Sequence, residues 1–179
     1  MAARTTMADI IATLRLWADD KNADDFSDQE LQDVLDQRAY VASYEETTAI
    51  DAIESGSTVY KEFQAERQYF EADAILTNGS YDTLTPDTAD YKLAYFTFTT
   101  SQDLPVLIYG WWYDINAAAA DCWDLKAAKW AGQFDFSVDG GSYQQSQRVA
   151  HAKAQATAYR AKSATSSEMG VIRRIDVID

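Results

Sequence analysis

The chain of 179 residues contains little cysteine, histidine or basic charge. Its one cysteine, Cys122, excludes a disulfide framework within the chain and favours a reducing compartment. Its one histidine, His151, lies in a polar segment. One cysteine and one histidine are too few to form a Cys/His cluster that binds a metal. The sequence also lacks a Gly-rich phosphate loop and a nucleophile elbow. These absences disfavour an enzyme, and we predict no catalytic, cofactor-binding or metal-binding residue.

Long apolar runs are missing as well. The longest, Pro105 to Tyr113, is too short to cross a bilayer and contains Gly110. No segment has the pattern of a signal peptide, so we expect no membrane association. With 47% hydrophobic and 13% aromatic residues, the chain can still bury a sizeable core.

Acidic residues outnumber basic ones by 29 to 15, which gives a net charge of −14. This balance argues against a nucleic-acid-binding protein, because phosphate neutralisation needs clustered Lys and Arg. The distribution is uneven: residues 1–55 hold 13 acids and 4 bases, and residues 142–179 hold 6 bases and 3 acids. Such asymmetry suits head-to-tail contact between copies, and a plain solvated acidic surface is the alternative.

Helices are expected at both ends of the chain. Two N-terminal segments repeat apolar residues at helical spacing, and Ser27 with Glu30 forms a capping box before the second. After Tyr113, an Ala-rich helix capped by Asp114 or Asn116 should end near Gly132. A further helix should open at a capping box of Ser142 and Gln145. We expect the helices to pack through Leu14, Trp17, Leu31, Leu35, Trp123 and Trp130.

The middle of the chain favours strands. Its aromatic and β-branched runs flank an Asn78-Gly79 turn, which is a strong hairpin signal. Residues 40–53 are ambiguous and are interpreted as an extension of the preceding helix. We predict three to five antiparallel strands whose aromatic residues lie mostly in the core. An exposed aromatic row would instead indicate a stacking platform for nucleotide bases.

The predicted fold class is therefore α+β and mainly helical. It consists of a bundle of about four helices, an inserted small antiparallel β lobe and an extended C-terminal tail. The boundaries are residues 1–57 for the N-terminal helices, 58–112 for the β lobe, 113–163 for the second helix pair and 164–179 for the tail.

A family resemblance accompanies these helices. The segments "IIATLRLWADD" and "FSDQELQDVLDQR" precede "YDINAAAADCWDLKAAKWAGQFDFSVDGGSYQQSQ". Together they resemble the head–tail connector (adaptor, or head completion) proteins of tailed bacteriophages. The resemblance covers about residues 7–38 and 105–163. It is a pattern of packing residues and helix caps, not a catalytic signature.

The resemblance implies a structural virion protein of the neck, assembled in the host cytoplasm. It implies a ring of about twelve copies between the portal and the tail. Head-to-tail contacts form such a ring when the rotation between neighbouring copies closes. The partners would be the portal protein, the tail or neck proteins (stopper and terminator) and other copies. DNA would pass through without sequence-specific binding. The alternative is a stand-alone acidic interaction module, such as an assembly factor or inhibitor.

Two groups of residues are candidates for assembly contacts. The C-terminal run is β-branched and needs a partner strand, either in its own sheet or in another protein. The resemblance favours docking on the portal or on a neighbouring copy. This run is Val171, Ile172, Arg173, Arg174, Ile175, Asp176, Val177 and Ile178. On the last helix, Arg148, Lys153 and Arg160 are expected to meet acidic neighbours around the ring.

Overall fold

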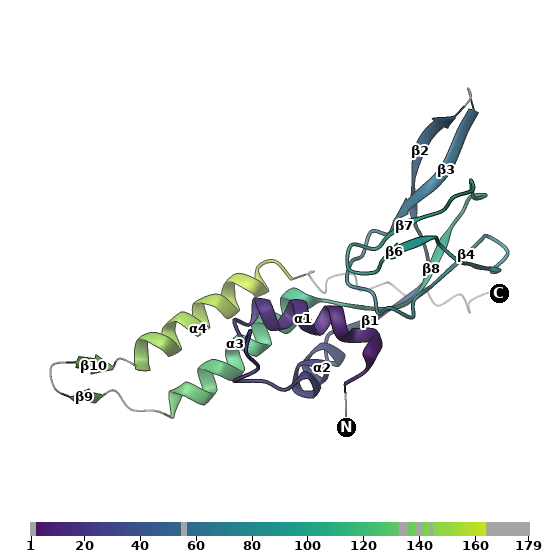
Figure 1. The fold of residues 1–179 in the computed structure, drawn as a ribbon. Helices are drawn as coiled ribbons and strands as arrows, with labels where there is room; N and C mark the ends of the chain where they lie inside the picture. The colour runs from purple at the N-terminus through teal and green to yellow at the C-terminus, as the bar shows by residue number, and fades with distance from the viewer. Residues whose placement is uncertain (1–2, 55–56, 133–135, 139–140, 144, 164–179) are drawn as a thin grey trace, which may run out of the picture.

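The computed structural model describes residues 3–54, 57–132, 136–138, 141–143 and 145–163. It is elongated, with a helical part at one end and a β lobe at the other (Figure 1). The helical part contains a 3₁₀ turn and four α-helices, and a short hairpin joins the last two. Their bounds are η1 Thr5–Met7, α1 Ala8–Trp17, α2 Asp28–Asp36, α3 Ile115–Ala131, β9 Phe136–Val138, β10 Gly141–Tyr143 and α4 Gln145–Arg160.

The β lobe is built from two antiparallel four-stranded sheets. Sheet A has the strand order β1-β8-β4-β5, and sheet B has the order β2-β3-β7-β6. The chain passes from sheet A to sheet B at Thr47, whose amide donates to the carbonyl of Val106 at 2.9 Å. The bounds are β1 Ala39–Glu46, β2 Thr48–Glu54, β3 Ser57–Gln64, β4 Ile75–Thr77, β5 Thr83–Leu84, β6 Thr88–Asp90, β7 Tyr95–Thr97 and β8 Leu107–Tyr113.

The prediction of a mainly helical bundle with a small β insert is wrong. The structure is 37% helix and 28% strand, which makes it a mixed α+β protein. The largest error concerns residues 40–53, which form most of β1 and β2 instead of extending a helix. Pairing of β1 with β8 buries Ala42 completely against the core of the lobe, and this long-range contact decided the conformation. The strands therefore begin at Ala39 and not at Thr58.

The core of the β lobe lies between the two sheets. Phe70, Phe96 and Phe98 are buried there, which confirms that these aromatic residues are core. A Cβ at Gly110 of β8 would lie 2.5 Å from the Cβ of Ala74. Only glycine therefore allows the segment before β4 to cross β8 so closely. The Asn78-Gly79 turn does join two paired strands, β4 and β5.

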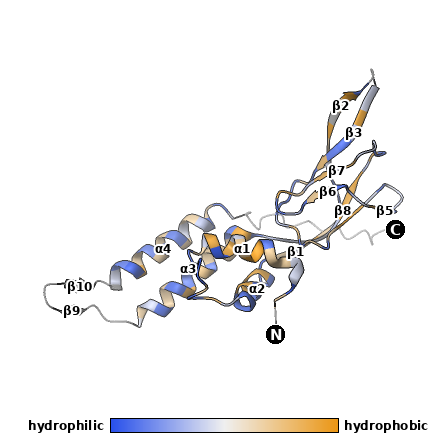
Figure 2. Cartoon of the chain, in the orientation of Figure 1, coloured by the Kyte–Doolittle hydropathy of each residue, from blue (hydrophilic) through white to orange (hydrophobic). Residues whose placement is uncertain are grey.

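Helix α3 is the centre of the helical part and is buried on two sides. One side packs Ile115, Ala118, Ala119 and Cys122 against α1 and α2, including Leu14, Leu31 and Leu35. The other side packs Ala120, Trp123 and Ala127 against Ala152 and Ala156 of α4. The alanines let the helices approach closely. Figure 2 colours much of α1 as hydrophobic and α4 as largely hydrophilic, consistent with the narrow contact of α4.

The two tryptophans of α3 lie differently from the expected packing against the N-terminal helices. Trp123 is buried against α4, and its indole nitrogen donates to the carbonyl of Trp17 in α1 at 3.1 Å. Trp130 packs on the same α4 side and is only half-buried. Trp17 itself packs on the edge of the α1–α2 core and stacks on Tyr159.

The helix caps follow the sequence at three of four predicted ends. The Ser27–Glu30 capping box is present, Asp114 accepts from the amide of Ala117, and α3 ends at Gly132. The prediction that Ser142 caps the last helix is wrong. Ser142 pairs with Ser137 in the β9–β10 hairpin, and α4 begins at Gln145.

A buried carboxylate joins the helical part to the β lobe. Glu71 is 4% exposed and accepts from the hydroxyls of Thr6 and Tyr113. The guanidinium of Arg4 lies 3.1 Å from the same carboxylate and 2.6 Å from Asp36 of α2. Burial, together with the hydrogen bond to Glu71, raises the pKa of the Tyr113 phenol. This cluster ties η1, α2, β8 and the segment before β4 together.

Two aspartates of the α1–α2 loop hold this loop in place. Asp20 is 3% exposed and pairs with Arg15 at 2.6 Å. Asp25 lies 2.7 Å from Lys129 and 3.0 Å from the buried Lys126 of α3. The hydrogen bond from Lys129 is the main cause that lowers the pKa of Asp25. The loop is thus fastened to α3 by charge pairs.

We expect the substitution Trp123→Ala to destabilise the protein by about 3–5 kcal/mol, because it removes a buried indole and leaves a cavity between α3 and α4. The matched control on the same helix is Leu125→Ala, whose side chain is 49% exposed and whose loss should cost about 0.5 kcal/mol or less. Urea denaturation followed by circular dichroism gives both values. Equal midpoints for the two variants would contradict this packing.

We expect Asp25→Asn to reduce stability at pH 7, and we expect this loss of stability to become smaller as the pH falls below about 4. The folded-state pKa of Asp25 lies below the ordinary aspartate value of 3.8. The ionised group therefore stabilises the fold above that value, and this contribution is lost as the pH falls through the folded-state pKa. Urea midpoints of both proteins measured from pH 3 to pH 7 check this expectation. A constant difference across that range would show that Asp25 acts through packing and not through charge.

Candidate interaction surface

An exposed apolar surface covers the side of sheet A that faces away from sheet B. Trp111 and Tyr109 project from it on β8, and their exposed fractions are 48% and 41%. Large apolar side chains are rarely grouped in this way on a surface without a partner. We name this surface the aromatic face, and it consists of Val41, Tyr44, Ile75, Tyr81, Tyr109 and Trp111.

The strand register places these side chains together. Val41 of β1 pairs with Trp111, and Ile75 of β4 pairs with Tyr109. Paired residues of antiparallel strands point to the same side of a sheet. The aromatic face is therefore continuous across three neighbouring strands, and Ala42, Leu76 and Ile108 fill the opposite, buried side.

A bulge in β1 brings a further ring to this surface. The register shifts between Ser43 and Glu45, and the intervening Tyr44 has a φ of 55°. Bulges of this kind redirect a side chain. The Tyr44 ring stacks on Tyr109 at 5.0 Å and meets Tyr81 edge-on at 4.9 Å.

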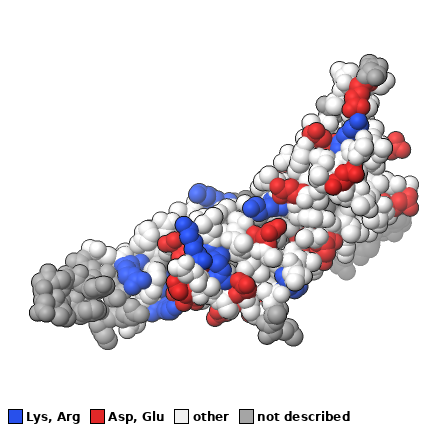
Figure 3. Space-filling view, in the orientation of Figure 1, with Lys and Arg blue, Asp and Glu red and all other residues white. Residues whose placement is uncertain are grey.

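The charge around the aromatic face is unsuitable for nucleic acid. Residues 39–113 contain 12 acids and only 3 bases. In Figure 3 acidic side chains spread over the β lobe, and basic side chains gather mainly along the helical part. Platforms that stack nucleotide bases combine their rings with a positively charged groove. An exposed aromatic row is present, but its surroundings favour contact with protein.

A polar pocket adjoins the base of the aromatic face. It has a volume of about 370 Å³ and lies where β1 and β8 meet η1 and α2. Trp111 belongs both to this pocket and to the aromatic face. The pocket therefore gives the apolar surface a charged end, and its lining is Arg4, Asp36, Ala39, Glu71, Asp73, Trp111 and Tyr113.

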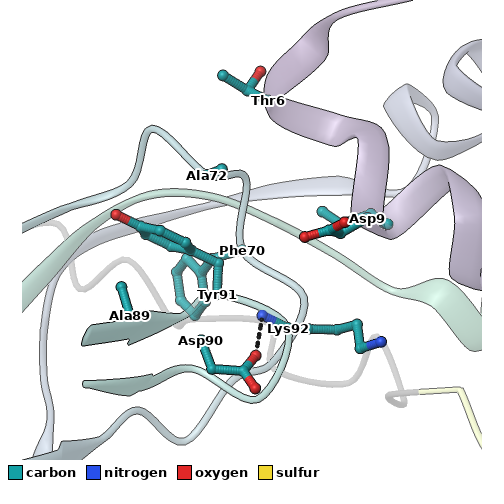
Figure 4. A pocket seen from close by; sticks show the side chains of 9 residues that line it. Thr6, Asp9, Phe70, Ala72, Ala89, Asp90, Tyr91 and Lys92 are labelled. Carbon is teal, nitrogen blue, oxygen red and sulfur yellow. Dashed lines mark hydrogen bonds between the residues drawn. The ribbon is translucent and has the colours of Figure 1, made fainter. Parts of the chain in front are cut away.

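A second pocket, of about 390 Å³, lies between the start of α1 and the turn after β6 (Figure 4). The carboxylates of Asp9 and Asp90 line it from opposite sides, and Asp90 accepts a hydrogen bond from the backbone amide of Lys92. Neither histidine nor cysteine is among its lining residues.

A third pocket, of about 550 Å³, lies between α3, α4 and the α1–α2 loop. Arg148 lies over the ring of Trp130 at 4.3 Å, and His151 meets the ring of Trp123 edge-on. His151 is exposed on α4. These cation and ring contacts fasten α4 to α3.

The three basic candidates of α4 lie in different environments. Arg160 pairs with Asp121 and Asp124 of α3 in its own chain, and these contacts raise the pKa of its guanidinium. Arg148 contacts Trp130, also within the chain. Lys153 is exposed on α4. The tail, residues 171–178, lies outside the described residues.

Cys122 is buried between α3 and the N-terminal helices. Burial is the main cause that raises the pKa of this thiol to about 12. The neutral thiol is a poor nucleophile, so Cys122 is a packing residue.

The aromatic face was missed by the sequence analysis. The alternation of Ile108, Tyr109, Gly110 and Trp111 does mark a strand with two different sides. Both sides are apolar, however, so the pattern alone gives no reason to place one of them in solvent.

No family model, curated protein or solved structure matches this chain. In the described part of the chain, none of the helices is both long and apolar enough to span a membrane. Among the same residues, no three His, Cys, Asp or Glu side chains are grouped so that they could hold a metal ion.

We expect Cys122 in the native protein at pH 8 to react with a thiol reagent at least about 100-fold more slowly than in the unfolded chain, because the buried thiol is protonated and shielded. Reaction with Ellman's reagent, followed with and without urea, measures the ratio. A native rate within a factor of about three of the unfolded rate would show that α3 opens readily.

Proposed function

We propose that this protein is a structural virion protein, a head–tail connector that forms a ring between the portal and the tail of a bacteriophage. The observation that carries the proposal is the aromatic face, because exposed apolar patches of this kind mark protein–protein contacts. The resemblance of the helices to the connector family is the reason for proposing a connector ring in particular. The partners would be the portal, the tail or neck proteins and about twelve copies of the chain itself, joined by contacts that close.

The uneven charge supports this proposal. The acidic β lobe and the more basic α4 lie towards opposite ends of the elongated molecule (Figure 3). Opposite charges on two different surfaces favour heterologous contacts between copies. Such contacts form a closed ring when the rotation that relates one copy to the next brings the last copy back to the first. Lys153 is the better candidate for such a contact, because Arg160 is already paired with Asp121 and Asp124.

The acidic surplus also suits passage of DNA. A wall of carboxylates repels phosphate, whereas a basic wall would hold DNA through the release of counterions. The β lobe, with 12 acids and 3 bases, is the part of the chain that would supply such a wall.

We expect Trp111→Ser to prevent ring assembly while the monomer stays folded. Truncating a central aromatic contact costs an interface about 2 kcal/mol or more, or about 30-fold in affinity. The matched control is Leu93→Ser, a residue of the same lobe that is 50% exposed and lies outside the aromatic face. Light scattering of the purified proteins gives the masses. Rings of unchanged mass and stability from Trp111→Ser would contradict this role of the aromatic face.

Imaging of virions separates the connector from a stand-alone interaction module. A connector lies in the neck as a closed ring, and its loss yields heads without tails. A chain that stays monomeric at every concentration and is missing from the neck would contradict the proposal and favour the module.

A further inference from the structure

We propose that the aromatic face of one copy binds the exposed side of α4 of a second copy, so that neighbouring copies join head to tail. The inference rests on the proposed function, because it identifies the two surfaces that meet between copies of the ring. We name the exposed side of α4 the α4 surface, and it consists of Ala150, Lys153, Ala154, Thr157 and Ala158.

The aromatic face has acidic residues at both ends of its strands. At one end, Glu46 of β1 pairs with Leu107, and alternate residues of β8 share a side, so Glu46 lies on the same side of sheet A as Tyr109. At the other end, the lining of the polar pocket beside Trp111 holds three acids and one base. A partner that covers this face therefore needs an apolar centre and basic residues at its border.

These charges disfavour a symmetric contact in which two aromatic faces meet. An isologous contact places a surface against the same surface of the other copy. It would bring two acidic borders together, and like charges that meet at an interface oppose binding. The neighbour therefore presents a different surface, and that surface is basic.

Helix α4 has the required charge. Of the described helices and strands, it is the one that carries bases without an acid. Lys153 is exposed in the middle of the α4 surface. Arg160 is already paired with two aspartates of α3, so Lys153 is the base that we expect to meet the acidic border.

The α4 surface also has the required apolar centre. Its alanines are exposed and recur every four residues, so they form one row along the helix. The row spans about 12 Å, which is close to the width of about 10 Å across β1, β8 and β4. Short side chains let the rings of Tyr109 and Trp111 approach the helix closely. The stem of Lys153 can cover further apolar surface while its ammonium group reaches a carboxylate.

The α4 surface that covers the aromatic face belongs to a second copy. Within its own chain, α4 is held on α3 by the buried Ala152 and Ala156. Figure 1 shows α4 alongside α3, in the part of the molecule that lies away from the β lobe. The same chain would lose this packing if its α4 moved onto sheet A. Two different surfaces of identical chains make a heterologous contact, which is the kind that builds rings.

Disulfide trapping between two full-length variants tests the contact. Val41→Cys and Ala154→Cys are mixed and oxidised, and we expect a cross-linked dimer that contains one copy of each. The control replaces Val41→Cys with Leu93→Cys, which is similarly exposed but lies between β6 and β7 of sheet B. Cys122 stays in place, because it is buried.

Absence of the mixed dimer, or an equal yield from the control, overturns the proposal. A disulfide between two copies of Val41→Cys that forms in preference to the mixed dimer would show that two aromatic faces meet, and it would overturn the proposal as well.

Exchange of charges tests the same contact without added cysteines. Lys153→Glu and Glu46→Lys should each weaken self-association about tenfold or more, because each variant places like charges together. A mixture of the two variants should assemble again, since every contact in an alternating assembly then joins opposite charges. Sedimentation of each variant and of the mixture measures the effect.

The matched control is Glu54→Lys, an exposed residue of β2 whose substitution changes the net charge by the same amount. It should leave self-association unchanged. Failure of the mixture to restore assembly, or an equal loss from the control, overturns the contact between the aromatic face and α4.

Neither experiment needs a virion. A chain that forms the mixed dimer but is absent from the neck refutes the connector function alone. A chain found in the neck that forms no mixed dimer refutes this contact alone.

Discussion

The position of the β lobe depends on one buried carboxylate. Glu71 accepts hydrogen bonds from Thr6 and Tyr113 and pairs with Arg4, so it joins residues that are far apart in the sequence. A buried charge must be satisfied in this way, because loss of one partner leaves an unpaired group in a poorly solvated site. Tyr113 is the last residue of β8, and Asp114 caps α3. The same few residues therefore end the sheet, start the central helix and hold the N-terminal segment against both.

The aromatic face is a consequence of this arrangement. The two sheets bury their facing sides against each other, and the helices cover only the base of sheet A. The outer side of β1, β8 and β4 is left without cover from any described helix or strand, although its residues are as apolar as many in the core. Grouped exposed apolar side chains of this kind are typical of surfaces that contact another molecule.

The charges of the chain divide into two kinds. Arg15 with Asp20, and Lys126 and Lys129 with Asp25, fasten the loop of the helical part and are largely used within the chain. The carboxylates of the β lobe have few basic partners, because only 3 bases lie among residues 39–113. This second group gives the β lobe its acidic surface.

Local signals in the sequence determined the start of α2, both ends of α3, the strands β3 and β8 and the turn before β5. Ser27, Asp114, Gly132 and Asn78 act through neighbours only a few residues away, so their effect can be predicted from the chain. Tertiary structure alone decided that residues 40–53 form strands, that α3 is buried on two sides and that Asp20 and Glu71 are core residues. It also decided which side of β8 faces solvent. Each of these features depends on a contact between residues that are distant in the sequence. A segment whose residues are apolar on both sides, or whose periodicity is ambiguous, does not by itself specify which segment it packs against.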